Sequence, residues 1–275
     1  MTDVDTSRRP VVVGVDGSEH SRRALEWAAG EARLRGAVLH IVHALPFGLS
    51  PSGGPDLHVD AATRSLTELA AVARSLDSRP LTVTNDVVDG LPVKMLVEVS
   101  RHSALVVLGS RGQGGFANLL LGSTAVEVSA RAASPVVVVP PGADVLNRSG
   151  DVMVGVDGSH DEPALEFAFS RASQRWARLV AIHVWDLPDG ERAEEESDAL
   201  LARTLTPWQD RFPDVIVETR SIRGQVVAAL VAASAAHGEV IVVGGRGRSV
   251  LAGALLGSVS QGLLRHAAVP VVIAR

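Results

Sequence analysis

Short apolar runs alternate along the chain with longer segments in which apolar residues recur every three or four positions. The first run, residues 11–15, reads VVVGV and is too short for a helix, so it predicts a buried strand. Residues 24–34 then show apolar positions at helical spacing, between Ser18, a favourable N-cap, and Gly36, a favourable helix stop. The pattern therefore predicts a strand followed directly by a helix.

The same alternation continues to residue 139. Further strands are expected at residues 38–44, 81–87, 105–108 and 136–139, and helices at residues 61–76, at 93–99 and from Gly122 onward. Residues 46–55, rich in proline and glycine, predict a surface loop. Strands that alternate with helices predict a doubly wound parallel sheet with helices on both faces. Ligands of such sheets bind beyond the carboxyl ends of the strands.

The second half of the chain repeats the first. Residues 152–159 read VMVGVDGS and differ from residues 11–18 at one position, and ALEFA at residues 164–168 repeats an earlier ALEWA. Later residues fit the same plan, with an acidic helix at 191–203, a strand at 215–221 and a helix at 226–235. We therefore predict two α/β domains, residues 1–140 and 151–275, joined by a linker at residues 141–150.

Each half also carries a glycine-rich loop between a strand and a helix. The spacing is G-x2-G-x9-G-S in both copies: Gly109, Gly112, Gly122 and Ser123, then Gly244, Gly247, Gly257 and Ser258. Glycine lets backbone N–H groups approach an anion, and a helix start adds N–H groups of its own. Two copies at identical spacing favour a phosphate cradle over a loop that is merely tight.

The candidate ligand contacts lie at these loops and at the ends of the first strands. They are Gly14, Asp16, Gly109, Ser110, Arg111, Gly112, Gly114, Gly115, Gly122, Ser123 and Thr124 in the first half, and Gly155, Asp157, Asp186, Gly244, Gly245, Arg246, Gly247, Arg248, Gly257, Ser258, Val259 and Ser260 in the second. If the first and fourth strands are neighbours, both groups of residues face one crevice.

Some of these residues have an alternative interpretation. Asp16 and Asp157 are placed to accept from ribose hydroxyls or to hold a metal-bound water, but an Asx turn or a helix cap is the alternative. Ser18 and Ser159 are the expected caps, which favours the ligand role for the aspartates. Arg111 and the matching arginine of the second loop are either phosphate partners or solvated surface side chains. Asp186, which has Pro46 as its counterpart, is expected to contact the base or the sugar.

Composition excludes several classes of function. The chain has no cysteine, which excludes disulfides and thiolate chemistry, and a net charge of −5 argues against a nucleic-acid partner. No lysine lies near either loop, so this is no Walker A loop and strong phosphoryl transfer is not expected. No apolar run approaches the roughly 20 residues of a membrane span, and the polar start does not resemble a secretion signal. We therefore expect a cytoplasmic protein without a membrane partner.

His40 and His43 lie on opposite faces of one strand and are expected to be core or edge residues rather than ligands of a shared metal.

The doubled G-x2-G-x9-G-[ST] pattern resembles that of tandem universal stress proteins of the ATP-binding type. This resemblance implies an α/β fold of the adenine-nucleotide alpha hydrolase-like kind, with two five-stranded parallel sheets of strand order 3-2-1-4-5. It also implies ATP, with magnesium, bound once per domain by the glycines and terminal serines named above and by Asp16 and Asp157. Family members pair through their last strands, which implies that residues 136–139 and 271–274 meet within the chain, and a homodimer is possible.

The resemblance further implies a nucleotide-dependent regulator of stress response, growth or dormancy, with an unknown protein partner and at most weak ATP hydrolysis. Two alternatives stay open. One is a slow ATPase or nucleotide transferase on the same scaffold. The other is an interaction protein that binds no nucleotide, which the intact glycine loops argue against.

Overall fold

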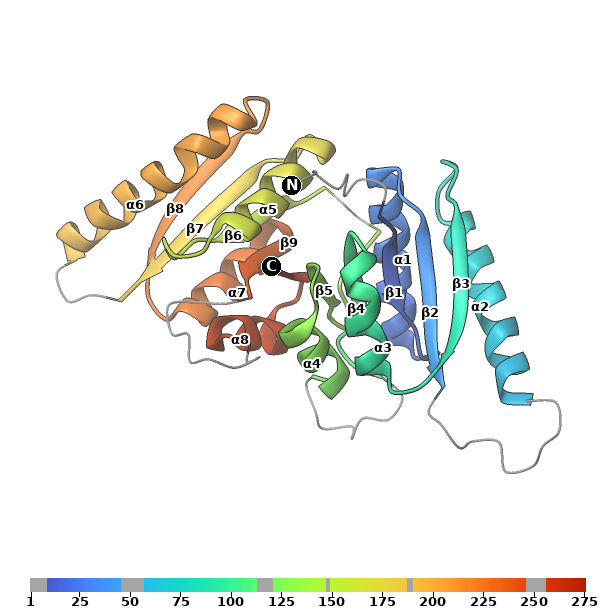
Figure 1. Cartoon of the computed structure of the whole chain (residues 1–275). Helices are drawn as coiled ribbons and strands as arrows, with labels where there is room; N and C mark the ends of the chain where they lie inside the picture. The colour runs from blue at the N-terminus through green and yellow to red at the C-terminus, as the bar shows by residue number, and fades with distance from the viewer. Residues whose placement is uncertain (1–8, 46–56, 113–120, 147–148, 187–189, 246–255) are drawn as a thin grey trace. The chain divides into compact units, whose positions relative to one another are not determined.

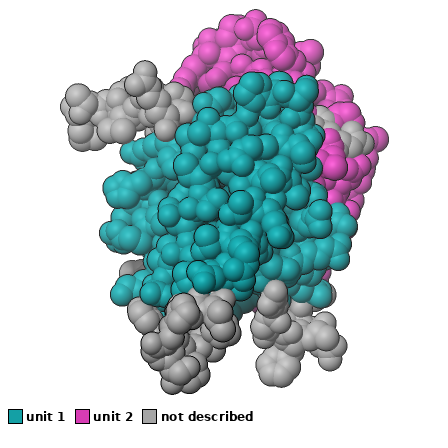
Figure 2. Space-filling view, turned by 90° about the vertical axis from the view of Figure 1, so that its right-hand side faces the viewer, with its two compact units in different colours: residues 1–141 teal, residues 142–275 magenta. Residues whose placement is uncertain are grey.

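The computed structural model describes residues 9–45, 57–112, 121–146, 149–186, 190–245 and 256–275. Two compact units make up the chain, unit 1 with residues 1–141 and unit 2 with residues 142–275 (Figure 2). The residues of the predicted linker lie around this division. The predicted loop at residues 46–55 lies outside the described residues.

Unit 1 is built on a parallel sheet with the strand order β3-β2-β1-β4-β5 (Figure 1). Its strands are β1 (Val11–Gly14), β2 (Leu39–Leu45), β3 (Val83–Asp89), β4 (Leu105–Gly109) and β5 (Val136–Val139). The central strands are buried on both faces, as their continuous apolar runs predict. Strands β1 and β4 are neighbours, with Val11 opposite Leu105, so their carboxyl ends lie side by side.

Helices cover both faces of this sheet (Figure 1). They are α1 (Glu19–Arg35), α2 (Leu57–Ser75), α3 (Pro92–Val99) and α4 (Ser123–Arg131), with a short 3₁₀ turn at Ser100–His102. Helix α1 begins and ends as its sequence predicts: Ser18 Oγ accepts from the Ser21 amide at 3.2 Å, and Gly36 ends the helix with φ of 60°.

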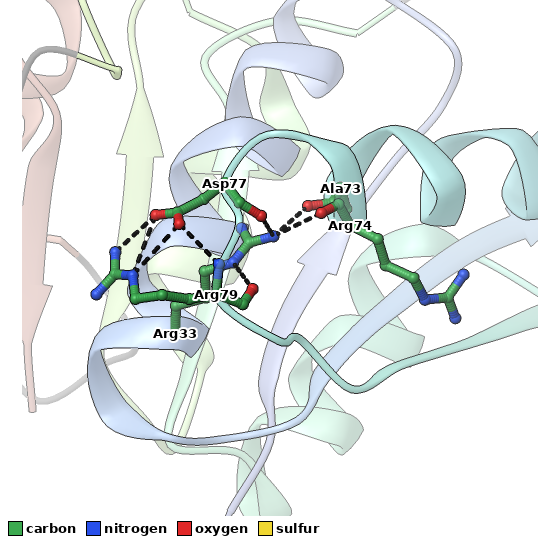
Figure 3. A network of polar contacts seen from close by, with 5 residues as sticks. All are labelled: Arg33, Ala73, Arg74, Asp77 and Arg79. Atoms are coloured by element: carbon green, nitrogen blue, oxygen red, sulfur yellow. Dashed lines mark hydrogen bonds and ion pairs between the residues drawn. The ribbon is translucent and has the colours of Figure 1, made fainter.

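One buried arginine joins the first two helices of unit 1. Arg33 of α1 donates from Nη2 to the carbonyls of Ala73 at 2.9 Å and Arg74 at 3.0 Å, which are among the last carbonyls of α2 (Figure 3). Its Nη2 and Nε also reach the carbonyls of Asp77 at 3.4 Å and Arg79 at 3.0 Å in the connection that follows. The guanidinium therefore caps α2 and fixes the start of the chain segment that leads to β3.

Unit 2 repeats this architecture, with the strand order β8-β7-β6-β9-β10. Its elements in chain order are β6 (Asp151–Gly155), α5 (Glu162–Arg175), β7 (Leu179–Trp185), α6 (Gly190–Arg211), β8 (Val217–Arg223), α7 (Val226–His237), β9 (Gly238–Gly244), α8 (Ser258–His266) and β10 (Val271–Ala274). Counted within each unit, both sheets have the order 3-2-1-4-5, which confirms the predicted fold.

Two sequence-based expectations about unit 2 are wrong. Ser159 does not cap the first helix, because α5 begins at Glu162 and its N-cap is Asp161. Helix α6 runs on to Arg211, past the expected end and through Pro207. Its last turns place Trp208 on the ring of Phe169, with centroids 5.9 Å apart, so tertiary packing offsets the helix-breaking effect of the proline.

Candidate functional site

The acidic turn and the glycine loop of unit 1 meet at the carboxyl edge of the sheet, as the crevice hypothesis requires. Asp16 follows β1, and Gly112 lies in the loop after β4. A Cβ built on Gly112 would lie 2.4 Å from Asp16 Oδ2, so only a glycine backbone approaches this carboxylate so closely. The two motifs, about 95 residues apart in the sequence, therefore form one site.

The Asp16 carboxylate also shapes its own turn. Its Oδ1 accepts from the Ser18 amide at 3.0 Å, across Gly17 with φ of 83°. This Asx turn is the alternative that the sequence left open, and it uses one carboxylate oxygen while the other faces Gly112. The structural and the ligand interpretations of Asp16 are therefore compatible.

Unit 2 has the same turn with a second carboxylate added. Asp157 Oδ1 accepts from the Ser159 amide at 2.7 Å and from its hydroxyl at 2.6 Å, across Gly158 with φ of 79°. Asp161 reaches back, and its carboxylate accepts from the amides of Asp157 at 3.2 Å and Gly158 at 2.7 Å. The turn amides that end β6 are thus held by a side chain from the start of α5.

The starts of α4 and α8 are suited to anion binding. Their N-caps are Gly122 and Gly257, and neither helix start has a side-chain cap hydrogen bond in the described residues. Ser123 and Ser258 open the two helices and are exposed. Free N–H groups and the positive end of the helix dipole favour a phosphate at this place.

In unit 2 these groups line a cavity of about 440 Å³, within the range of small-molecule sites. Its lining includes the carboxylates of Asp157 and Asp161 and the start of α8 with Ser258. It also includes apolar side chains from the strand ends and from α7: Val156, Ile182, Val184, Val226, Leu230 and Val243. The cavity therefore combines apolar side chains, which suit a nucleobase, with a helix start that suits an anion.

The cavity also contains several residues that the sequence predicts. They are Gly155, Asp157, Gly244, Gly257, Ser258, Val259 and Ser260. Ser260 is buried and donates to the Gly244 carbonyl at 3.0 Å, which fixes the start of α8 against the end of β9. Ser260 is itself one of the predicted residues, so a predicted side chain holds the end of β9 and the start of α8 together.

Packing explains several of the predicted glycines without a ligand. A Cβ on Gly14 would lie 2.8 Å from Leu108, and one on Gly109 would lie 2.7 Å from the His20 backbone. In unit 2, a Cβ on Gly155 would lie 3.2 Å from Val243, and one on Gly245 would lie 3.3 Å from the Ala274 carbonyl. These glycines permit close packing around the site, and the residues beside them in the sequence supply its polar groups.

The remaining predicted residues are placed as follows. Gly122 donates to the Ser110 carbonyl at 2.8 Å, which closes the first loop, and Thr124 lies half-buried in the first turn of α4. The Ser110 hydroxyl is buried without a hydrogen-bond partner in the described residues, and Arg111 is half-buried. Asp186 lines a second cavity, of about 580 Å³, between the end of β7 and α6. The following lie outside the described residues: Gly114, Gly115, Arg246, Gly247 and Arg248.

Sequence reasoning missed the residues that complete the unit 2 cavity. Asp161 was hidden because the segment between the Asp-Gly-Ser turn and the Ala-Leu-Glu motif is one residue shorter in unit 2, a difference that aligning the halves reveals. His183 also lines the cavity. The sequence shows it as the counterpart of His43 but does not indicate a place at the site. Val226 and Leu230 gave no signal beyond that of an apolar helix.

No group of three or more His, Asp or Glu side chains is placed to hold a metal ion in the described part of the chain. Within the same residues, no helix combines the length and the apolar character needed to cross a membrane.

Two doubly wound α/β units, each with an Asp-Gly-Ser turn after its first strand, define the class of protein. The model of the universal stress protein family matches residues 7–140 and again residues 149–275. The chain belongs to the universal stress protein family, as a tandem member.

The sequences of known members align with almost the whole chain. The chain is 36% identical over 285 residues to universal stress protein Rv2005c of Mycobacterium tuberculosis, with 96% of each chain covered. It is 34% identical over 300 residues to Rv1996 of the same organism, covering 96% of this chain and 94% of the other. A universal stress protein structure from Archaeoglobus fulgidus has a TM-score of 0.73 at 22% identity and covers 98% of this chain and 97% of its own, which supports the fold.

Proposed function

We propose that each unit binds one ATP, with magnesium, and that the protein acts as a nucleotide-dependent regulator of stress response, growth or dormancy. The observation that carries this proposal is the unit 2 cavity, which lies between Asp157 and the uncapped start of α8. Phosphates fit the helix start, the base fits the apolar wall, and the carboxylate suits ribose hydroxyls or magnesium-bound water.

The chemistry of the site supports binding more than turnover. The only lysine of the chain, Lys94, lies in α3 and not in a glycine loop, so no lysine is placed as in a P-loop to stabilise charge on a transferred phosphoryl group. A slow ATPase is the competing function. Phosphate release that scales with protein concentration and is lost in an Asp16→Asn/Asp157→Asn double variant would favour it.

The direct test measures nucleotide stoichiometry. Purified protein is saturated with MgATP, washed, denatured, and the released nucleotide is identified by chromatography and mass; we expect two nucleotides per chain. In Val226→Trp the indole should enter the unit 2 cavity and halve the stoichiometry. Ala228→Trp is the matched control, because Ala228 is exposed on the same helix and does not line the cavity.

Two outcomes would count against this proposal. No released nucleotide, together with a melting temperature that MgATP does not change, would remove its basis and favour an interaction protein. An unchanged stoichiometry in Val226→Trp would show that the cavity is not the nucleotide site.

The pairing of residues 136–139 with 271–274, the homodimer and the regulatory partner remain predictions.

A further inference from the structure

Equivalent histidines near the ends of β2 and β7 have different hydrogen-bond partners in the two units. His43 Nδ1 lies 2.7 Å from the carbonyl oxygen of Val15, whereas His183 Nδ1 lies 2.8 Å from Ser197 Oγ on α6. His183 lines both the cavity at the end of β6 and the adjacent cavity beside α6. The protonation of its ring nitrogens therefore bears on the site proposed above.

The partner of His43 fixes its tautomer. A backbone carbonyl only accepts hydrogen bonds, so Nδ1 of His43 is the protonated donor. A neutral imidazole carries a single proton, which leaves Nε2 of His43 as an acceptor.

The partners of His183 fix the opposite tautomer. The Trp185 indole N–H, which can only donate, lies 2.8 Å from Ser221 Oγ, and Ser221 donates to Ser197 Oγ at 2.7 Å. Each hydroxyl has one proton, so Ser197, which already accepts from Ser221, directs its own proton to Nδ1 of His183. The neutral ring of His183 therefore carries its proton on Nε2.

Unit 1 cannot form this relay. The strand register pairs His183 with Ser221 in unit 2 but His43 with Val87 in unit 1. Leu45 occupies the place of Trp185 at the end of the second strand. Neither leucine nor valine has a hydrogen-bonding side chain, so the relay is a property of unit 2 alone.

We propose that His183 is a specificity-determining residue of the unit 2 site, held by the Trp185–Ser221–Ser197 relay as an Nε2–H donor toward an acceptor atom of the bound nucleotide. The equivalent His43 carries its proton on Nδ1 instead, so the two units differ in the tautomer of this ring. The serines and the tryptophan act as positioning residues. The ligand part of this inference rests on the proposed function, but the tautomer assignment does not.

The tautomers are tested first, without ligand. Long-range ¹H–¹⁵N spectra of the full chain at pH 8 distinguish the two tautomers, and His43→Gln and His183→Gln assign the two signals among the nine histidines. We expect Nδ1–H for His43 and Nε2–H for His183. Ser197→Ala should shift His183 toward Nδ1–H, and Ser197→Thr should restore Nε2–H. Ser234→Ala is the matched control, because Ser234 is another buried serine of unit 2 that donates to a backbone carbonyl. An Nδ1–H signal for His183 in the unaltered protein would overturn the assignment.

The ligand role is tested next by titration with MgATP. Loss of one neutral hydrogen bond is expected to weaken binding by about two- to tenfold, so Ser197→Ala should weaken one of the two sites by this factor and Ser197→Thr should not. An altered tautomer with unchanged affinity would overturn the specificity role. Absence of ATP binding in the unaltered protein would instead count against the proposed function and leave the tautomer assignment standing.

Discussion

Units 1 and 2 share their order of elements but anchor their first helices differently. In unit 1, α1 starts directly after Ser18, which caps it. In unit 2 the helix starts later, His160 adopts a φ of 55°, and Asp161 takes over the turn amides. The Asp-Gly-Ser turn is nevertheless the same in both, with closely similar glycine φ angles. The Asp-Gly-Ser turn is therefore preserved between the units, while the start of the helix behind it varies.

The ends of these helices differ as well. Gly36 and Trp176 end α1 and α5 with φ of 60° and 55°, and their amides bond to equivalent carbonyls. A left-handed conformation is favourable for glycine and strained for tryptophan. The Trp176 side chain is 85% exposed, so packing does little to offset that strain.

The two units differ most in their buried charged side chains. Arg171 of α5 is buried and contacts Glu239 at the start of β9, and Arg175 contacts the same carboxylate at 2.9 Å. In unit 1 the residues at the positions of Arg171 and Glu239 are Glu31 and Ala104. Unit 2 therefore joins its first helix to the sheet by charge, and unit 1 uses Arg33 to join its first helix to its second.

The largest expected effect tests the charged cluster of unit 2. Glu239→Gln removes the carboxylate that both guanidiniums contact, and breaking a buried pair costs about 3–5 kcal/mol. Urea unfolding combined with hydrogen exchange in α5 and β9 measures the loss. Glu218→Gln is the control, because Glu218 pairs with Arg178 and Arg220 nearer the surface, where pairs contribute about 0–1 kcal/mol. Equal losses in the two variants would contradict the assigned role.

The next effect tests the arginine of unit 1. Arg33→Ala leaves the last carbonyls of α2 without their charged donor and is expected to cost about 2 kcal/mol. Hydrogen exchange should increase in α2 and leave unit 2 unchanged. Arg74→Ala serves as the comparison, since its guanidinium donates to the Val83 carbonyl at an exposed place. A loss in Arg33→Ala no greater than in Arg74→Ala would show that the guanidinium does not hold α2.

A reciprocal pair of substitutions tests the helix ends. Trp176→Gly should stabilise unit 2 by about 1 kcal/mol, because glycine adopts the left-handed cap without strain. Gly36→Ala should destabilise unit 1 by a similar amount. Thermal unfolding measures both, and opposite signs are expected. A destabilised Trp176→Gly protein would mean that the exposed indole makes a stabilising contact.

The smallest effect concerns acid pH in unit 1. Hydrogen bonds from the Arg79 side chain and amide lower the pKa of Asp77 from 3.8 to about 2. Because the pKa is lower in the folded state, the stabilisation is complete above pH 3.8 and is lost as pH falls toward 2. Asp77→Asn should therefore lower the melting temperature at neutral pH slightly and abolish this part of its decrease between pH 4 and 2. If the melting temperatures of the two proteins fell equally between pH 4 and 2, Asp77 would not contribute to the acid sensitivity.

Much of this protein follows from local sequence. The elements and the duplication were predicted, because apolar periodicity and helix caps act over a few residues. The start of α5 was predicted wrongly, because Ser159 has the right chemistry for a cap but a one-residue difference moves the helix start. The end of α6 was missed because its packing against Phe169 is a long-range contact.

The site depended on tertiary structure to a greater extent. The sequence marked Asp16 and Gly112 as candidate site residues, and the adjacency of β1 and β4 brings them into contact. The apolar side chains of the unit 2 cavity come from the strand ends and from α7, and the relay to His183 comes from β7, β8 and α6. These residues show no shared spacing in the sequence. Contacts between distant elements depend on how the sheet is wound, and no local pattern in the chain records them.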